Sequence, residues 1–476
     1  MTQIRGWQRI SLVWVPITAW VLAAAGCASF AGRDPDVQPL PPRQVAERVT
    51  LVDRNGPVAP TAQARVLAQV RAEGSGQLLQ HHLGVLAAGN EGDTTLLRGN
   101  TAKLLIDGPD TFTAMKAAIT AARHRILVEF YIVEGEGVAA EVADLLIRKA
   151  GEGVSVAMMY DSLGSLGTEK AFFDRLRDGG VHVCAFNPLN PLERPGHWGL
   201  VQRNHRKMLA ADSDVAFTGG INLSNVYAEG SFSSARRPKV PPEDADKQGW
   251  RDTQVELHGP VVNALAAVFR ESWALQGCKG DLPPAPPPKV ATPGQRVVKL
   301  VAGDPANGVN PTYTALLRAI DASQRSVQLT MAYFAPGPDL IQALCDAAQR
   351  GVAVSLVLPG RSDVTMVLHA ARSRYRQLLA AGVQIHEMSQ NVMHAKTAVI
   401  DGVFSSVGSS NLDWRSIVGN NEIDVIVLGE DFGEQMQALF TRDLAASERI
   451  DAASWAKRGL GQRIKEGFAR MVEPLL

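Results

Sequence analysis

Residues 203–212 read Arg-Asn-His-Arg-Lys-Met-Leu-Ala-Ala-Asp, and residues 394–401 repeat the pattern as His-Ala-Lys-Thr-Ala-Val-Ile-Asp. Both copies contain His-x-Lys, then four residues, then Asp. Each is followed by a glycine-rich turn that ends in asparagine, Gly-Gly-Ile-Asn at 219–222 and Gly-Ser-Ser-Asn at 408–411. In both copies the asparagine follows the histidine by 17 residues (205 to 222 and 394 to 411). Two copies with matched turns predict an internal repeat with a shared function.

The alternation of side chains along a β-strand explains why this spacing suits chemistry. Residues i and i+2 point to the same face, so the histidine and lysine of each copy project together, while Arg206 points the other way. The glycine-rich turn then brings its asparagine back toward that face. The predicted catalytic residues are His205, Lys207 and Asn222 from the first copy, and His394, Lys396 and Asn411 from the second. Two facing copies would form a positive, donor-rich cavity suited to one phosphate diester. The alternative is two unrelated core strands that each carry a histidine.

These motifs and several flanking segments resemble the phospholipase D superfamily, which is named for its paired His-Lys-Asp motifs. Within it, the chain is most similar to the bacterial cardiolipin synthases, from about Leu96 to Leu476. The segments that carry the resemblance are 130–132 (Phe-Tyr-Ile), 203–207, 219–222, 250–253 (Trp-Arg-Asp-Thr), 393–397, 411–416 and 474–476 (Pro-Leu-Leu). The resemblance implies an α/β fold of two similar phospholipase D-like domains. Each would be a largely parallel mixed sheet flanked by helices, with a pseudo-two-fold axis between them and the active site at their interface.

The resemblance also implies a two-step phosphatidyl transfer through a covalent phosphohistidine. By analogy, His205 is expected to attack phosphorus and His394 to act as acid and base. The lysines and asparagines would neutralise the charge of the transition state. No cofactor and no metal are expected.

A histidine that attacks phosphorus needs an acceptor at its other ring nitrogen. Asp252 and Glu422 are the candidates, because each begins a strand-like segment at a matching place in the repeat. Asp212 and Asp401 follow the motifs at turns and are expected to be structural, as in the superfamily. Ser409 occupies the place that Gly220 has in the first copy, where a phosphate contact and simple turn chemistry are equally compatible with the sequence.

The repeat extends beyond the motifs and divides the chain. In each half, a helical stretch leads to an apolar strand and a second helix leads to another, within 111–160 and 312–358. This alternation indicates a largely parallel sheet covered on both faces. Six prolines between 283 and 293 exclude a helix or a central strand there. We therefore predict phospholipase D-like domains at 96–276 and 298–476, a linker at 277–297, and a tether and N-terminal extension at 33–95.

The first 32 residues resemble an export signal or a membrane anchor. Arg5 and Arg9 precede an uncharged, apolar run from Ile10 to Gly32, which is typical of such segments. Its Leu-Ala-Ala-Ala-Gly-Cys end, at 22–27, is similar to a bacterial lipoprotein signal in which Cys27 would be lipidated. Ala24 departs from that pattern, so an uncleaved anchor remains an alternative. We expect a membrane-associated protein of the bacterial cell envelope.

Charge and cysteine content add two constraints. Lys plus Arg and Asp plus Glu both number 48, which argues against a nucleic-acid partner, because domains that bind nucleic acid usually carry a basic excess. The other three cysteines, Cys184, Cys278 and Cys345, show no metal-ligand spacing. Nothing in the sequence pairs them, and buried or incidental thiols are expected.

Three functions are compatible with the motifs. The first is a cardiolipin synthase-type phosphatidyltransferase that acts on phospholipids, with phosphatidylglycerol as the expected substrate. The second is a phospholipase D-type hydrolase, which differs only in using water as the acceptor. The third is an inactive, membrane-tethered lipid-binding protein, which the two intact motifs disfavour. The resemblance over most of the chain and the membrane-attached start favour the first.

The C-terminus predicts an amphipathic helix. From Leu460 onward, Leu460, Ile464, Phe468, Met471 and Val472 recur at helical spacing, and basic residues surround them. Such a face could lie on an anionic bilayer or pack on the second domain. We expect packing on the domain, because the family resemblance continues through Leu476.

Overall fold

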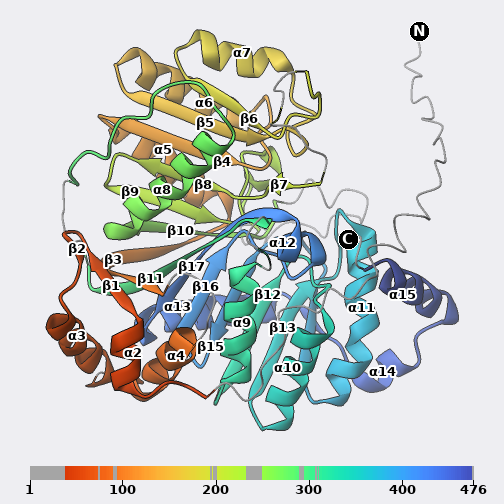
Figure 1. Ribbon diagram of the computed structural model, residues 1–476. Coiled ribbons are helices and arrows are strands. Elements are labelled where there is room, and N and C mark those ends of the chain that lie inside the picture. Colours follow the sequence, from red (N-terminus) through yellow and green to blue (C-terminus); the bar gives the residue numbers. More distant parts are fainter. Residues whose placement is uncertain are drawn as a thin grey trace, which may run out of the picture.

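The computed structural model describes residues 38–72, 75–88, 94–192, 196, 201–231, 249–288, 294–305, 308 and 310–473. Two halves of the chain repeat one order of strands and helices, and they meet along the edge strands of their sheets (Figure 1). In Figure 1 the first half lies above the second.

The first half follows the predicted alternation of helices and apolar strands. Its elements are β3 (Thr95–Ile106), α5 (Asp107–Ala121), β4 (Arg125–Phe130), α6 (Val138–Gly151), β5 (Ser155–Asp161), α7 (Lys170–Asp178), β6 (His182–Phe186), β7 (Arg203–Asn204), β8 (Met208–Ala211), β9 (Val215–Gly219), the 3₁₀ helix η1 (Asn225–Tyr227), β10 (Thr253–His258) and α8 (Pro260–Leu275).

The second half repeats this order and then adds a short C-terminal section. Its elements are β11 (Arg296–Gly303), α9 (Pro311–Asp321), β12 (Ser326–Met331), α10 (Pro338–Gln349), β13 (Ala353–Pro359), α11 (Thr365–Ala380), β14 (Gln384–Met388), β15 (Lys396–Ile400), β16 (Phe404–Gly408), α12 (Trp414–Val418), β17 (Asn420–Leu428), α13 (Glu430–Ala445), β18 (Glu448–Arg449), α14 (Ala452–Ala456) and α15 (Leu460–Val472).

Each half has a mixed sheet. The first runs in the order β6-β5-β4-β8-β9-β10-β3, the second in the order β14-β13-β12-β15-β16-β17-β11. The two sheets are joined where β3 and β11 pair antiparallel. Helices cover both faces of each sheet, which explains why all six residues of β4 are buried.

The parallel part of each sheet is smaller than expected. Only β4, β5 and β6 of the first sheet, and β12, β13 and β14 of the second, are parallel. The prediction of a largely parallel sheet is therefore wrong in its proportion, although a mixed sheet flanked by helices is confirmed. Helices connect β4 to β5 and β5 to β6, and likewise β12 to β13 and β13 to β14, so these strands can run parallel. By contrast, only residues 212–214 separate β8 from β9, and only residues 401–403 separate β15 from β16, so these two pairs form antiparallel hairpins.

Much of the expected tether is folded. Residues 42–88 contain α2 (Pro42–Arg48), β1 (Thr50–Asp53), β2 (Gly56–Pro57), α3 (Pro60–Ala72) and α4 (Gly76–Ala88). Their apolar side chains join the core of the second half, and the fully buried His82 side chain contacts Asp401, with Nε2 2.9 Å from Oδ2. The polar, proline-rich composition concealed this, because the prolines stand at helix starts, where they are tolerated.

The first half carries a disulfide that the sequence did not indicate. Cys184 on β6 is bonded to Cys278, just after α8, across 94 residues, with the two Cα atoms 5.7 Å apart. The expectation of unpaired thiols is therefore wrong for these two residues, because α8 folds back over the sheet and brings distant parts of the chain together. Cys345 is free and buried, as expected.

The amphipathic C-terminal helix is present as α15, but its orientation differs from the expectation. Leu460, Ile464, Phe468 and Met471 are exposed, whereas Ala469 and Glu466 on the opposite face are buried. The helix thus packs on the second half through its small and acidic residues rather than through its large apolar ones.

The proposed signal or anchor, residues 1–32 with Cys27, lies outside the described residues. Among the helices of the described ranges, none is long and apolar enough to cross a membrane.

Candidate active site

The two histidine motifs enter the interface as extended chain that is bonded to the opposite half. The His205 N–H donates to the Asn421 carbonyl at 2.9 Å, and the His394 N–H donates to the Arg251 carbonyl at 2.8 Å. His205 lies in the link between β7 and β8, and His394 lies just before β15. Each histidine is therefore positioned by the backbone of both halves.

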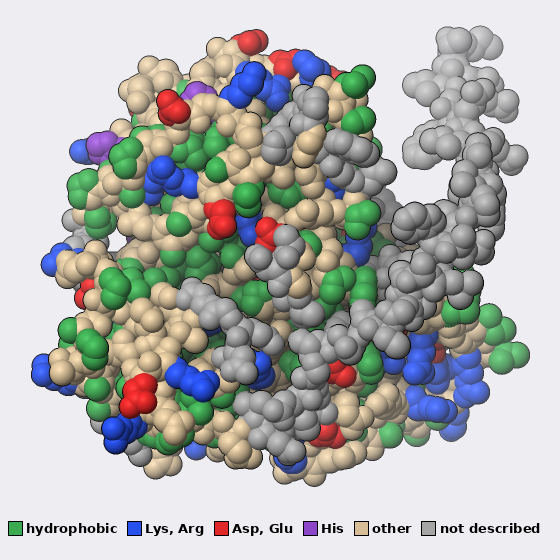
Figure 2. Space-filling model, viewed as in Figure 1, with side chains coloured by type: hydrophobic (Ala, Val, Ile, Leu, Met, Phe, Trp, Pro, Cys, Tyr) green, Lys and Arg blue, Asp and Glu red, His purple; other side chains and the backbone are tan. Residues whose placement is uncertain are grey.

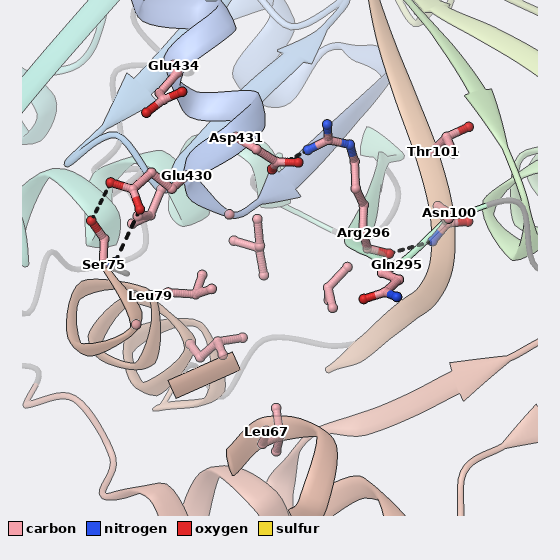
Figure 3. A pocket seen from close by; sticks show the side chains of 17 residues that line it. Leu67, Ser75, Leu79, Asn100, Thr101, Gln295, Arg296, Glu430, Asp431 and Glu434 are labelled. Carbon is pink, nitrogen blue, oxygen red and sulfur yellow. Dashed lines mark hydrogen bonds and ion pairs between the residues drawn. The ribbon is translucent and has the colours of Figure 1, made fainter. Parts of the chain in front are cut away.

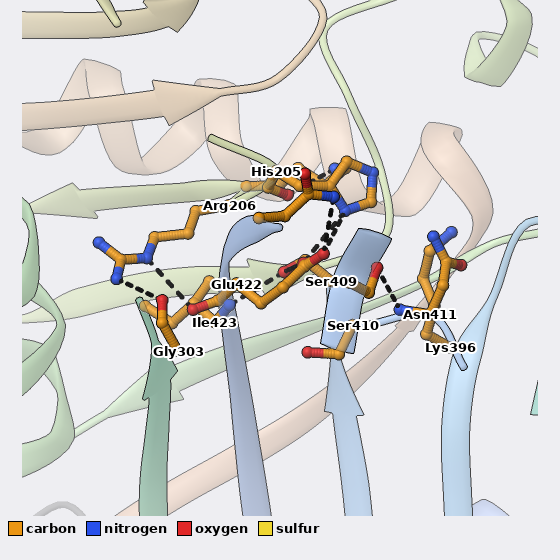
Figure 4. A network of polar contacts seen from close by, with 12 residues as sticks. His205, Arg206, Gly303, Lys396, Ser409, Ser410, Asn411, Glu422 and Ile423 are labelled. Carbon is orange, nitrogen blue, oxygen red and sulfur yellow. Dashed lines mark hydrogen bonds and ion pairs between the residues drawn. The ribbon is translucent and has the colours of Figure 1, made fainter. Parts of the chain in front are cut away.

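Arg206, between His205 and Lys207, points the other way, as strand alternation predicts. Its Nη2 donates to the Gly303 carbonyl at 2.9 Å, and its Nε donates to the Glu422 carbonyl at 3.2 Å (Figure 4). The buried guanidinium thereby ties the first motif to β11 and β17 of the second half.

Each histidine is held by a carboxylate from the opposite half. His205 Nδ1 lies 3.0 Å from both carboxylate oxygens of Glu422 (Figure 4), and His394 Nδ1 lies 2.7 Å from Asp252 Oδ2. An Nδ1–H that donates to a carboxylate leaves Nε2 as the reactive nitrogen. The sequence predicted both carboxylates but not their crossing: Asp252 belongs to the half of His205, yet it holds His394.

Lys207 and Lys396 are buried beside the histidines. Lys207 Nζ donates to the His205 carbonyl at 2.6 Å, and Lys396 Nζ contacts the His394 carbonyl and lies 3.0 Å from its Nδ1. Burial lowers the pKa of Lys207 to about 7 and that of Lys396 to about 8, although nearby carboxylates act in the opposite direction. A bound anion would favour the charged form of both lysines.

Burial and positive neighbours also lower the pKa values of both histidines. The pKa of His205 lies well below its ordinary value of 6.5, because the side chain is buried and because the two lysines and His394 lie nearby. The pKa of His394 is lowered by burial and Lys396, whereas Asp252 opposes the shift. The mutual effects place both histidines and both lysines in one site.

Ser409 lies behind Glu422. Its hydroxyl donates to Glu422 Oε2 at 2.5 Å (Figure 4). Burial raises the pKa of Glu422 to about 7, against the charge of Lys207 and the hydrogen bond from Ser409. Besides the phosphate contact and the turn chemistry that the sequence left open, the structure shows a further role for Ser409, which is support of the carboxylate that holds His205.

Gly220 has the matching place in the first half for a steric reason. A Cβ there would overlap the Asp252 carboxylate. The shorter Asp252 with Gly220, and the longer Glu422 with Ser409, are therefore two solutions to one packing problem.

The two asparagines return to the site, but with different partners. Asn222 Oδ1 accepts the Ile132 N–H at 3.1 Å, which fixes the amide, and its Nδ2 lies 3.5 Å from the Tyr227 hydroxyl. The buried Oδ1 of Asn411 has no hydrogen-bond partner among the described residues.

Asp212 and Asp401 lie at the turns after β8 and β15, at the opposite ends of these strands from His205 and His394. Both have positive φ, at 55° and 54°, and each accepts three successive backbone N–H groups. The donors are residues 123–125 for Asp212 and 324–326 for Asp401. This geometry supports the structural role expected for them.

Aromatic residues surround the histidines, and no role was predicted for them from the sequence, although Tyr131 and Trp250 lie in segments that carry the family resemblance. The Tyr227 hydroxyl lies 3.0 Å from His394 Nδ1, and Trp250 packs on the same ring with centroids 5.3 Å apart. Tyr131 and Tyr333 pack edge-on against His205 and His394, at 5.0 and 6.1 Å. Tyr131 and Tyr333 could have been found from the sequence, because each tyrosine follows the first apolar strand of its half.

A separate cavity of about 640 Å³ lies away from the histidines, between α4, β3, β11 and the start of α13 (Figure 3). Leucines line it together with two polar pairs: the Ser75 hydroxyl donates a hydrogen bond to Glu430, and Arg296 is ion-paired with Asp431. None of its lining residues belongs to the histidine site, and the chemistry of the two motifs therefore lies elsewhere.

The chain is similar to known proteins. A family model described as "Cardiolipin synthase, PLD-like domain" matches residues 316–444. Cardiolipin synthase A of Salmonella arizonae is 34% identical over 388 residues, which cover 80% of this chain and 76% of that protein. The protein of the same name from Salmonella newport matches with the same identity and coverage.

One solved structure supports the fold. Phosphatidylserine synthase of Haemophilus influenzae matches with a TM-score of 0.57 and 14% identity, covering 79% of this chain and 95% of that one. The mixed sheets, the paired motifs and the identity over most of the chain agree with one another. The chain therefore belongs to the cardiolipin synthase family of the phospholipase D superfamily.

Proposed function

We propose that the protein is a phosphatidyltransferase that makes cardiolipin from phosphatidylglycerol through a phosphohistidine. The observation that carries the proposal is the crossed arrangement of His205 with Glu422 and His394 with Asp252. It provides two reactive Nε2 atoms in one buried, lysine-lined site. The relatives named cardiolipin synthase A support the choice of acceptor.

In the first step, the Nε2 lone pair of His205 attacks phosphorus. A nitrogen–phosphorus bond forms, and the bond from phosphorus to the glycerol headgroup oxygen breaks. His394 donates a proton to that oxygen, and glycerol leaves. The strongly lowered pKa of His205 suits the nucleophile, and the contact with Asp252 stabilises the imidazolium form of His394 as acid.

In the second step, the headgroup hydroxyl of another phosphatidylglycerol attacks the phosphohistidine. His394 takes the hydroxyl proton, the nitrogen–phosphorus bond breaks, and cardiolipin forms with His205 free again.

Lys207 and Lys396 would stabilise the charge of the pentacoordinate phosphorus. Both are buried, so their charges act in a site with little water, where electrostatic stabilisation is strongest. Asn222 and Asn411 would add amide contacts to the phosphoryl oxygens.

Attachment to the cell envelope is part of the proposal. The apolar run before Cys27 supports export with lipidation or a single anchor, and the Cys184–Cys278 disulfide favours an oxidising compartment. Fatty-acid labelling that is lost in Cys27→Ser would support the lipoprotein; equal labelling of that variant would leave the uncleaved anchor.

Product analysis separates the candidate functions. Purified protein with phosphatidylglycerol vesicles should release glycerol and form cardiolipin in equal amounts. His205→Ala and His394→Ala should each lower turnover by about 10³-fold or more. Phosphatidic acid as the main product would instead identify a hydrolase, and the absence of both products would identify a lipid-binding protein without activity.

A further inference from the structure

Helix α15 presents an apolar stripe, defined as Leu460, Ile464, Phe468 and Met471, to the outside of the protein. These side chains are 72%, 64%, 52% and 71% exposed. They recur every three or four residues and therefore form one continuous face of the helix. Exposed large apolar side chains gathered in this way mark an interaction surface.

The packing of the helix fixes this orientation. Ala469 is buried against Ala335, Val367 and Ala370, and the buried Glu466 is ion-paired with Arg458 at 2.8 Å. At the end of the helix, Glu473 pairs with Arg374 of α11 at 2.6 Å. The inner face is thus anchored by specific contacts, so the stripe cannot turn inward without breaking them.

The charges around the stripe suit an anionic partner. Five basic residues but only two acidic ones lie between Lys457 and Glu473, and both acidic ones are the buried, ion-paired glutamates. At 3.6 residues per turn, exposed Lys465 lies on one flank of the stripe, and exposed Arg463 and Arg470 lie on the other. Figure 2 shows basic and apolar side chains gathered at the right-hand edge of the molecule, over α14 and α15.

The stripe is close to the histidine site. The cluster that holds Ala469 also includes Tyr333, whose ring packs edge-on against His394. The Tyr333 hydroxyl donates to Asp363 at 2.7 Å, directly before α11, against which α15 packs. A few side chains therefore separate the inner face of α15 from the catalytic histidine.

Other exposed apolar side chains lie at the same ends of the strands. Leu166 follows β5, Leu192 and Val201 lie between β6 and β7, and Val364 follows β13, with exposed fractions from 38% to 85%. Asp161 at the end of β5 accepts the N–H of Asn204, next to His205, at 2.8 Å. These loops therefore leave the sheets at the edge where the histidines lie.

We propose that α15 is a membrane-docking helix, whose apolar stripe inserts into the surface of an anionic phospholipid bilayer while its basic flanks contact the headgroups. An amphipathic helix of this kind lies in the plane of the membrane, with its apolar face among the acyl chains. Docking through α15 turns the histidine edge toward the bilayer, so a phosphodiester reaches the site without leaving the membrane surface. Only this delivery of a phosphodiester to the site rests on the proposed function; the docking of α15 does not.

A fluorescence experiment on the full chain tests the docking. The Phe468→Cys variant is labelled with an environment-sensitive fluorophore. The variant also contains Cys27→Ser and Cys345→Ala, so the introduced cysteine is the one free thiol beside the disulfide. Gln349→Cys is the matched control, because Gln349 is exposed at the end of α10, at the ends of the strands opposite the histidines. Vesicles contain phosphatidylglycerol or only phosphatidylcholine, each with a nitroxide-labelled lipid as quencher.

If α15 docks, phosphatidylglycerol vesicles should quench the label at 468 about threefold or more beyond the label at 349, and salt should weaken this quenching. Equal quenching at the two positions, or none at 468, would overturn it. Shielding of the 468 label from solvent in the absence of vesicles would also overturn the docking proposal. Shielding that increases with protein concentration would show that a second copy of the protein covers the stripe. Shielding that is independent of concentration would show that another part of the same chain covers it.

An activity arm separates docking from folding and from the proposed function. Because Phe468 is exposed, Phe468→Asp should keep the melting temperature, keep turnover of monomeric short-chain phosphatidylglycerol, and lower turnover on vesicles about tenfold. Equal turnover of wild type and variant on vesicles would contradict docking. If neither protein makes cardiolipin, the proposed function fails, while the quenching result still decides the docking.

Discussion

At the scale of single residues, the site depends on a crossed pair of hydrogen bonds. Glu422 reaches His205 and Asp252 reaches His394, each from the opposite half. The repeat predicted which acidic residues matter, because their places match in sequence. It did not predict the crossing, because the interface that produces it depends on how the two halves face each other.

We expect Asp252→Asn and Glu422→Gln to retain the fold and to lower kcat by about 10²- to 10⁴-fold, because an amide does not stabilise imidazolium. Asp424→Asn is the matched control: Asp424 is buried two residues beyond Glu422 on β17 and bonds Ser410 and Thr312 rather than a histidine. Steady-state kinetics with circular dichroism checks this. Wild-type rates in both test variants, or an equal loss in the control, would refute the buttressing role.

The lowered pKa values also predict the pH dependence of activity. The acid limb of kcat/KM should lie well below pH 6.5, where the pKa of His205 lies. The alkaline limb should begin below pH 6.5, as His394 loses the proton that it donates, and should steepen between about 7 and about 8, as Lys207 and Lys396 lose their charge. A bound anionic diester raises both lysine pKa values, so the limb of kcat should lie at higher pH than that of kcat/KM. Coincident alkaline limbs near pH 10 would contradict this account.

At the scale of elements, the apolar strands and the helices between them could be predicted, since a helix of about three turns and a continuous apolar strand leave distinct patterns. The proportion of parallel strands could not be predicted, because strand direction depends on the tight turns at Asp212 and Asp401. Both aspartates have a positive φ, which the tight turns require and which the identity of a single residue does not predict. The helices α2 and α4 were missed because their stability comes from packing on the second half rather than from their own sequence.

Asp212→Ala should destabilise the protein by about 2–4 kcal/mol, because three buried or half-buried N–H groups lose their acceptor. Asp212→Asn should cost less, since asparagine tolerates positive φ and keeps one acceptor oxygen. Hydrogen bonds from the backbone lower the pKa of Asp212 in spite of burial. Its contribution to stability is therefore present above its ordinary pKa of 3.8 and is lost as the pH falls through the folded value. Urea unfolding measures this, and equal stability of the alanine variant and wild type would contradict the structural role.

At the scale of the whole molecule, the two halves act as one enzyme, because each supplies a histidine and the carboxylate that holds the histidine of the other. The described part of 277–295 contains no helix or strand, and β11 begins at Arg296, inside the predicted linker. The N-terminal section and the Cys184–Cys278 bond add contacts that composition could not indicate, because both depend on parts of the chain far apart in sequence.

Peptide mapping without reduction should recover Cys184 and Cys278 as one linked pair. Cys184→Ser should destabilise the protein by about 2–4 kcal/mol, because the unfolded chain gains freedom over a long loop, and Cys184→Ser with Cys278→Ser should cost no more than the single change. Cys345→Ala serves as the control for loss of a buried thiol. Free thiols at both positions in the native protein would contradict the disulfide and remove its support for an oxidising compartment.

Detection of the covalent intermediate is the sharpest test of the proposed mechanism. Wild-type protein is mixed with phosphatidylglycerol, quenched in alkali to preserve phosphohistidine, digested and mapped by mass spectrometry, with Lys207→Ala and His205→Ala in parallel. The account predicts a phosphatidyl or phosphoryl adduct on the peptide that contains His205, a weaker one in Lys207→Ala, and none in His205→Ala. An adduct on His394 that persists in His205→Ala would reverse the assigned roles, and turnover to cardiolipin without any histidine adduct would contradict the mechanism.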